Sequence, residues 1–374
     1  MKADIQAIYA PLFLVMRIMG HYPFGINIER RFSVPTFFFF LLGIYFMGAL
    51  IYRLLSVPHF YSYYIALLIH GILEMVAYIL VVCKLREMAN TVQVLKTLQE
   101  KLPYIPTLKS DCRNFNWFLI INILLLIIMI VNCWIRAAIG QGFKQLAITY
   151  FFVIDELTVF WDVMTKIMMV TIICLSQVIP TFALLFYMLT CIVFKTFCYG
   201  FKKSLKGAKT QQSLDERFTL CKDLANAISD FNSKMNFFIF FMYIGLCMKA
   251  LRGIQALYFN FTMSSLIYNG PLLCHILTSF VALTIPAAQV HSAFEKISQE
   301  INFVKYRNVA FRAKSLFILK LQNTSAALTI WDVYDINKNM LLSTLGLIFS
   351  YSALLYEIDK SRLKDVKTSF KESL

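Results

Sequence analysis

The sequence predicts an all-α integral membrane protein with seven transmembrane helices, and three observations lead to this fold class. First, 59% of the residues are hydrophobic and 15% are charged, whereas soluble proteins contain about 45–50% hydrophobic residues. Second, the hydrophobic residues form runs of about 20 residues, the length at which a helix crosses the hydrocarbon of a membrane. Third, Lys and Arg gather in alternate connections between the runs. The apolar surface is therefore expected to face lipid rather than a single core.

The predicted spans differ in how free of charge they are. Spans one, three, four, six and seven are built on uncharged runs. Span two contains Glu74, and span five contains Lys249 and Arg252, which need a partner or water inside a membrane. In chain order the spans are predicted at 35–55, 60–83, 115–136, 167–194, 235–258, 266–290 and 339–358.

The segment 141–162 is predicted to be an outer loop. Its apolar run, 146–154, is too short to cross a membrane, and three acidic residues follow it. An eighth span at this place would invert the orientation of everything that follows.

The polar segments predict the orientation of the chain. Lys and Arg are concentrated in 1–34, 84–114, 195–234 and 296–338, and cytoplasmic segments are enriched in these residues. The N-terminus, 1–34, is therefore expected in the cytoplasm, and seven spans place the C-terminus outside the cell. The tail, 359–374, is also basic and goes against this rule.

Charge and composition argue against several function classes. The net charge of +15 does not require a nucleic-acid partner, because Lys and Arg beside the spans bind anionic membrane lipid. The nine cysteines have no metal-ligand spacing and the five histidines are scattered, so neither a cofactor nor an enzyme is expected. A G-protein-coupled receptor would have its N-terminus outside. A transporter is an alternative, although the two halves of the sequence show no repeat relation.

The basic connections at 201–234 and 291–338 are predicted to contain cytoplasmic helices. Ser213 and Glu216 fit a capping box at the start of the first helix. Helices that lie on the membrane surface would have the same apolar pattern, but a packed bundle that continues spans five and six is preferred. The apolar stripes, with spacings mostly of three and four, are Leu214, Phe218, Cys221, Ala225, Ile228 and Phe231, then Phe294, Ile297, Ile301, Val304 and Phe311.

Two stretches of the sequence carry a resemblance to a known family. An aromatic and acidic loop, Thr329 to Asn337, precedes an apolar helix in which Ser350-Tyr351 is followed by five residues and then by Glu357-Ile358. Near the start, Pro11-Leu12-Phe13 is followed by Arg17, Gly20 and Pro23-Phe24. The sequence resembles the insect gustatory receptors, which have Thr-Tyr and Gln-Phe at the corresponding C-terminal positions. With the order and polarity of the segments, the likeness covers nearly the whole chain.

This resemblance implies a ligand-gated, non-selective cation channel in the plasma membrane of a chemosensory neuron. A small-molecule tastant is expected to open it. The channel is expected to be a homotetramer or a heteromer with related receptors, held mainly by a tetrameric anchor bundle of the cytoplasmic helices. A subunit that works only with co-receptors is the alternative within the family.

The resemblance also assigns roles to the last span. Ser343, Leu347, Ser350, Leu354 and Glu357 fall on one helical stripe, which in the family faces a central cation pathway. A ring at Leu354 is expected to form the gate by dewetting, and Glu357 to lie at the outer mouth. Tyr351, on the neighbouring face, is expected to pack against adjacent helices and to take part in coupling. Alternatively, Glu357 ends the helix at the membrane surface and pairs with Lys360.

A receptor of this kind is expected to bind its ligand in the outer half of spans two to six. Glu74 is expected to face Lys249 or Arg252, because a buried charge needs a partner. An interhelical ion pair or water-facing side chains would explain the same residues without a ligand. Because Glu74 is the one carboxylate well inside a predicted span of this region, a sugar ligand is not favoured. The polar and aromatic candidates are Tyr64, His70, Glu74, Asn132, Trp134, Gln177, Arg252, Gln255, Tyr268 and His275.

One glycosylation sequon agrees with the predicted orientation. Asn260-Phe261-Thr262 falls in the predicted outer loop between spans five and six. A second sequon at Asn323 falls on the predicted cytoplasmic side, where it is expected to carry no sugar.

Overall fold

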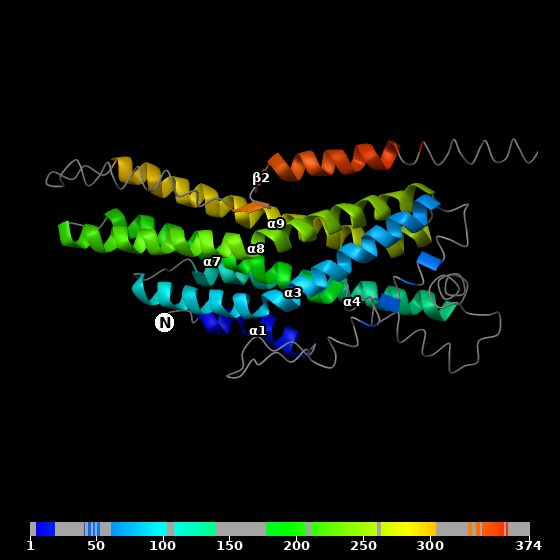
Figure 1. The fold of residues 1–374 in the computed structure, drawn as a ribbon, viewed down its shortest axis with the longest axis horizontal. Coiled ribbons are helices and arrows are strands. Elements are labelled where there is room, and N and C mark those ends of the chain that lie inside the picture. Colours follow the sequence, from blue (N-terminus) through cyan, green and yellow to red (C-terminus); the bar gives the residue numbers. More distant parts are fainter. Residues whose placement is uncertain are drawn as a thin grey trace, which may run out of the picture.

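The computed structural model describes a nearly all-helical chain, which confirms the predicted fold class (Figure 1). The described residues are 5–18, 41, 44–45, 48, 51–52, 61–102, 108–139, 177–206, 211–259, 263–303, 328–330, 334–336, 339–354 and 357. The helices are α1 (Ile5–Ile18), α3 (Tyr61–Lys101), α4 (Leu108–Ile139), α7 (Ile179–Lys206), α8 (Gln211–Phe259) and α9 (Met263–Phe303). Two short strands, β1 (Thr329–Ile330) and β2 (Tyr334–Asp335), precede the apolar helix Asn339–Leu354, called here the terminal helix.

Four helices in the described part of the chain contain segments long and apolar enough to cross a membrane. These segments are Phe115–Asn132, Ile179–Leu205, Asp215–Ile254 and Asn269–Ile297. They differ in where they lie: 89% of the α7 segment is buried within the chain, compared with 17% of the α4 segment. Helix α7 is therefore the centre of the bundle. Helix α4 exposes a row of large apolar residues, which suits a helix that faces lipid.

The long helices lie side by side and extend well beyond their apolar parts (Figure 1). Helix α3 continues past the predicted end of span two at residue 83, and α8 joins the predicted anchor segment to span five without a break. The predicted stripe on α8 is buried at Cys221, Ala225, Ile228 and Phe231. Because these residues pack against other helices of the same core, this stripe belongs to a packed bundle.

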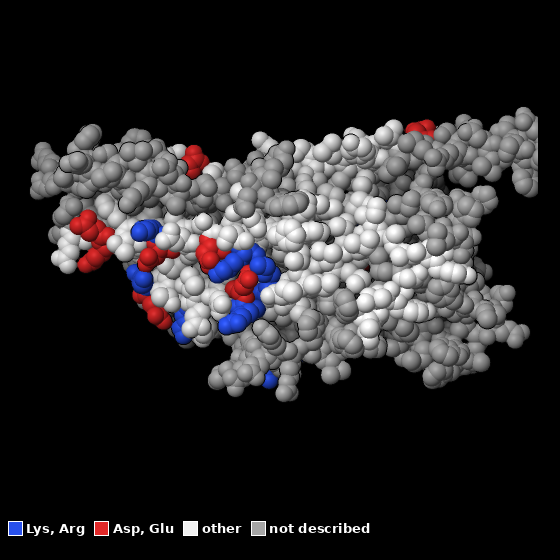
Figure 2. Space-filling model, in the orientation of Figure 1, with Lys and Arg blue, Asp and Glu red and all other residues white. Residues whose placement is uncertain are grey.

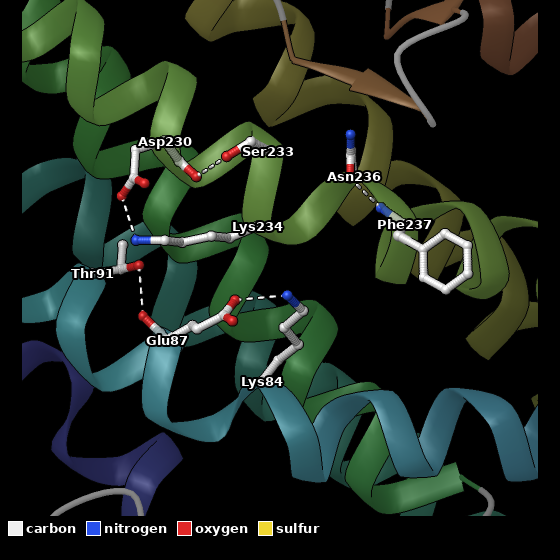
Figure 3. Close-up of polar contacts among 8 residues, drawn as sticks. All are labelled: Lys84, Glu87, Thr91, Asp230, Ser233, Lys234, Asn236 and Phe237. Atoms are coloured by element: carbon white, nitrogen blue, oxygen red, sulfur yellow. Dashed lines mark hydrogen bonds and ion pairs between the residues drawn. The ribbon is translucent and has the colours of Figure 1, made fainter.

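Charged residues mark where the apolar part of the bundle ends. On the face drawn in Figure 2 the described charged residues gather over one half of the molecule, and few of them lie over the other half. Figure 3 shows the charged residues of α3 and α8 that lie nearest the apolar half. Lys84 binds Glu87 at 2.8 Å, and Lys234 binds Asp230 at 2.6 Å. Between this level and the far end, α3 contains only Glu74 as a charged residue.

Two helix boundaries differ from the sequence prediction. Helix α7 continues from the predicted end of span four, residue 194, to Lys206, because Phe197, Phe201 and Leu205 extend its buried face. Residues 167–176 of that span lie outside the described residues. Helix α8 begins at Gln211, so the prediction that Ser213 is its N-cap is wrong.

Helix α1 is an element that the sequence analysis did not predict. It packs against α7 and α3 with Ile5, Tyr9, Leu12, Phe13 and Met16, all nearly inaccessible to solvent. The Tyr9 hydroxyl hydrogen-bonds Thr190 Oγ1 at 3.0 Å, and the rings of Tyr9 and Phe13 lie 5.3 and 5.9 Å from that of Phe186. The N-terminal helix α1 is thus part of the core.

A β-hairpin replaces the irregular loop expected before the terminal helix. Thr329 pairs with Asp335 and Ile330 with Tyr334 in antiparallel register. Leu328 and Ile336, at its two ends, are buried, and the Ile336 amide donates to the Leu328 carbonyl at 2.9 Å. The hairpin is therefore anchored in the core, and the terminal helix runs from it toward the end of the molecule at which α3 begins (Figure 1).

Several sequence predictions concern residues that lie outside the described part of the chain. These include most of span one, the segment 141–162, residues 304–327 and the tail from 358 onward. The orientation of the termini also stays a prediction.

Candidate functional site

A buried polar network joins three helices within the apolar half of the bundle. Glu74 on α3 forms an ion pair with Lys249 on α8, with 3.1 Å between Oε1 and Nζ. Gln177, in the turn that leads into α7, completes a triangle. Its Nε2 donates to Glu74 Oε1 at 3.0 Å, and its Oε1 accepts from Lys249 Nζ at 2.9 Å. The predicted pairing of Glu74 is thereby confirmed, with Lys249 as its partner.

The geometry of this triangle explains why two charges are stable in an apolar environment. The side chains of Lys249 and Glu74 are only 11% and 18% exposed, so each would be costly without the other. Gln177 has both a donor and an acceptor, and it uses one on each charge. The three side chains therefore provide hydrogen-bond partners for one another, and the two charges balance.

The network continues to α9 and α4 through the predicted His275 and through three residues that the sequence analysis did not name, Thr181, Thr278 and Asn122. Thr181 Oγ1, one turn after Gln177, lies 3.2 Å from Nε2 of His275 on α9. Thr278 Oγ1, also on α9, lies 3.4 Å from Asn122 Oδ1 on α4. Asn122 is the only polar residue between Phe118 and Val131, and that isolation is the signal that could have found it.

The other predicted ligand residues do not join this network among the contacts that the structure describes. Asn132 donates to the Ile267 carbonyl at 3.2 Å, and Arg252 is half-buried. The side chains of the remaining candidates lie outside the described part, as does the predicted glycosylation site Asn260. These candidates are Tyr64, His70, Trp134, Gln255 and Tyr268.

The terminal helix attaches to the bundle along one narrow stripe. Thr344, Ile348 and Ser352 are 7%, 4% and 0% exposed. The Thr344 hydroxyl contacts that of Tyr243 on α8, and it also donates to the Met340 carbonyl at 2.7 Å. This stripe follows a spacing of four residues and fixes the rotation of the helix.

The predicted pore residues lie on the remaining surface of the terminal helix. Leu347 and Leu354 are 58% and 55% exposed, and Ser343, Ser350 and Glu357 are also exposed. The serines donate to carbonyls one turn back, Asn339 and Gly346, at 3.0 and 2.9 Å. Such bonds let a serine face lipid or water equally.

Tyr351 also lies on the uncovered surface of the terminal helix. It is 56% exposed, so the described helices leave most of its surface uncovered. Any packing of this side chain would come from outside the described residues.

Comparison with known proteins gives a result for the three-dimensional structure alone. No family model matches the sequence, and no curated protein matches it. The insect olfactory receptor OR5 from Machilis hrabei matches with a TM-score of 0.69 over 95% of this chain and 100% of that chain, at 14% sequence identity. The same receptor in complex with eugenol matches with a TM-score of 0.73, at 13% identity and the same coverage.

The chain has the insect olfactory receptor fold. The match extends over nearly all of both chains, so the order of helices along the sequence is shared as well. Within this fold, the buried polar network and the exposed face of the terminal helix are the two features that bear on function.

Proposed function

We propose that this chain is a subunit of a ligand-gated, non-selective cation channel that a small-molecule tastant opens. Four copies, or copies mixed with related receptors, would surround a central pathway in the plasma membrane. The terminal helix would line that pathway with Ser343, Leu347, Ser350, Leu354 and Glu357.

The surface of the terminal helix carries the proposal. This helix uses one stripe, through Thr344, Ile348 and Ser352, for its own subunit and leaves most of its circumference uncovered. In a tetramer the free faces would pack against neighbouring subunits or face a central pathway. Glu357 supports the pathway, because an ionisable residue at the end of an apolar helix usually faces water or protein rather than lipid.

The polar network supports a ligand site within the same bundle. Polar side chains from five segments converge between apolar helices, which is how small-molecule sites combine apolar walls with a few oriented polar groups. The olfactory receptor of the same fold has been determined in complex with eugenol, a small molecule. A small-molecule ligand therefore suits both the fold and this network.

Helix α8 is the element that would connect the two sites. Lys249 joins the polar network, Tyr243 contacts Thr344 of the terminal helix, and Asn232 binds the hairpin that precedes it. A movement at Lys249 would reach the terminal helix through one rigid helix. The resemblance of the sequence to gustatory receptors favours a tastant over an odorant as the natural ligand.

Current recordings test the proposal. Cells that express the chain, alone and with related receptors, are expected to show a cation current when a panel of tastants is applied. In Glu357→Gln the calcium permeability relative to sodium is expected to fall, because a ring of carboxylates attracts divalent cations. Glu357→Asp, which keeps the charge, is the matched control.

Two outcomes would contradict the proposal. Unchanged ion selectivity in Glu357→Gln would show that Glu357 does not line the pathway. If the purified protein stays monomeric in gentle detergent, both alone and with related receptors, no central pathway between subunits can form, and the proposal is wrong.

A further inference from the structure

One atom of the buried network has no partner in the described part of the chain. His275 is 3% exposed, and its Nε2 lies 3.2 Å from Thr181 Oγ1. Its Nδ1 is buried as well, and none of the described residues hydrogen-bonds it. A buried polar atom that stays unpaired is costly, so a partner at this atom, such as a bound water, an ion or a ligand group, would stabilise the site.

The hydrogen bonds around Thr181 decide which nitrogen of His275 carries the proton. The Thr181 hydroxyl lies 2.6 Å from the Gln177 carbonyl, which can only accept, so the single proton of Thr181 is used there. Thr181 must then accept at its contact with His275. Therefore Nε2 of His275 carries the proton and donates it, and Nδ1 of the neutral ring is an acceptor.

The neighbouring polar groups cannot turn toward Nδ1 without losing bonds of their own. Glu74, Gln177 and Lys249 bind one another in the triangle described above. Thr278 donates to the His275 carbonyl at 2.9 Å. Within the described part of the network, Nδ1 is thus a buried acceptor without a hydrogen-bond partner, and an added donor would complete its hydrogen bonding.

We propose that Nδ1 of His275 accepts a hydrogen bond from the hydroxyl group of a neutral ligand, an alcohol or a phenol. This assignment rests on the proposed ligand-gated function and names the chemical class of its ligand. A carboxylate would set its oxygens against the Nδ1 lone pair, and the charge of Lys249, which could neutralise it, is already balanced by that of Glu74. An ammonium ion would lose its hydration beside Lys249. Ethers and esters without a donor would leave Nδ1 unpaired.

Matched pairs of compounds test the assignment. Binding to the purified protein in detergent is measured for alcohols and phenols and for their own methyl ethers, with eugenol and its methyl ether as one pair. Among the pairs that bind, the hydroxyl compound is expected to bind about 10-fold more tightly, because only it pairs the buried acceptor. Equal binding within the pairs would overturn the assignment and leave the receptor function standing.

Two substitutions separate the two ring nitrogens. The amide of His275→Asn reaches roughly the position of Nδ1, and that of His275→Gln reaches roughly the position of Nε2. His275→Asn is expected to keep the preference for hydroxyl compounds, whereas His275→Gln keeps the bond to Thr181 and is expected to lose that preference. The opposite result would overturn the assignment. Gel filtration and thermal melting of both variants check that they fold.

A measurement on the unaltered protein does not depend on either variant or on binding strength. Nitrogen NMR with isotope-labelled histidine is expected to show one neutral ring with a protonated Nε2 and an Nδ1 signal that shifts when a bound hydroxyl compound is added. A protonated Nδ1 on every neutral ring would overturn the assignment. If none of the compounds binds, the ethers included, both the assignment of Nδ1 and the proposed receptor function are overturned.

Discussion

Glu74 and Lys249 form an ion pair where α3 and α8 are otherwise almost free of charge. Both side chains are largely buried, and Gln177 holds both in place. A pair of this kind is not strongly stabilising compared with apolar residues, but losing one member leaves the other unpaired. The pair therefore specifies how α3 and α8 are rotated toward each other.

Removing one member of this pair is expected to destabilise the protein by about 3 kcal/mol. In Glu74→Gln the Lys249 ammonium stays buried without a counter-ion, and in Lys249→Gln the Glu74 carboxylate does. Thermal and denaturant unfolding in detergent measures the loss, and the double variant is expected to lose less than the sum of the two.

The matched control is the pair between Lys84 and Glu87 on the same helix. The Glu87 side chain is 33% exposed and lies at the charged boundary, so Glu87→Gln is expected to change stability by less than about 1 kcal/mol. Equal losses at Glu74 and Glu87 would contradict the assignment of Glu74 to an apolar environment.

At the scale of secondary structure, α8 contacts the C-terminal part of the chain at two places. The amide of Asn232 forms two hydrogen bonds with Thr329, donating to Oγ1 and accepting from the backbone N, both at 2.9 Å. Farther along, Tyr243 contacts Thr344. The hairpin and the terminal helix are therefore attached separately to the same helix.

Asn232→Ala is expected to loosen the hairpin selectively. The substitution removes both hydrogen bonds to Thr329, so hydrogen exchange of residues 328–336 is expected to accelerate roughly 10-fold. Asn226→Ala, an exposed site on the same helix, is the matched control and should leave that exchange unchanged. Acceleration spread evenly over α8 and α9 would speak against a local anchor.

The contact between Tyr243 and Thr344 is expected to behave as a coupled pair. Tyr243→Phe removes the hydroxyl but keeps the edge-on contact with Phe280, whose ring centre lies 5.7 Å away. Tyr243→Phe and Thr344→Val are each expected to lower the free energy of unfolding by about 1 kcal/mol, and together by no more than about 1.5 kcal/mol. Tyr199→Phe, at an exposed tyrosine, is the control. Strict additivity would show that the two hydroxyls act independently.

At the scale of the whole molecule, the described residues on the face drawn in Figure 2 divide into an apolar half and a charged half. The division follows the long helices, with Lys84 on α3 and Lys234 on α8 at the boundary shown in Figure 3. Lys and Arg prefer the cytoplasmic side of a membrane, so the charged half is expected to lie in the cytoplasm. The connection between α8 and α9 then lies outside the cell.

This orientation makes the two sequons a direct test. Asn260 follows the end of α8 and is expected to carry a glycan in cells, whereas Asn323 is not. Enzymatic removal of glycans is expected to change the electrophoretic mobility of the unaltered chain and of Asn323→Gln, but not of Asn260→Gln. A glycan on Asn323 but not on Asn260 would show that the chain has the opposite orientation in the membrane.

The candidate ligand site was predictable in part from the sequence. Glu74, Gln177, Lys249 and His275 stand out there because each is a polar residue in an apolar run. That Glu74 meets Lys249 rather than Arg252 depends on how two helices are rotated, which no local pattern specifies. Thr181 was missed because a threonine can satisfy its hydroxyl within its own helix and is common there.

By itself the sequence determined the all-helical membrane fold and the apolar stripes of the long helices, since hydrophobicity and helical periodicity are local properties. Only the tertiary structure decided that α1 enters the core, that a hairpin anchors the terminal helix, and which face of that helix stays uncovered. The contacts responsible join residues about a hundred or more positions apart, such as Asn232 with Thr329 and Tyr9 with Thr190. They arise when whole helices pack, and packing selects one rotation for each helix from several that its sequence allows.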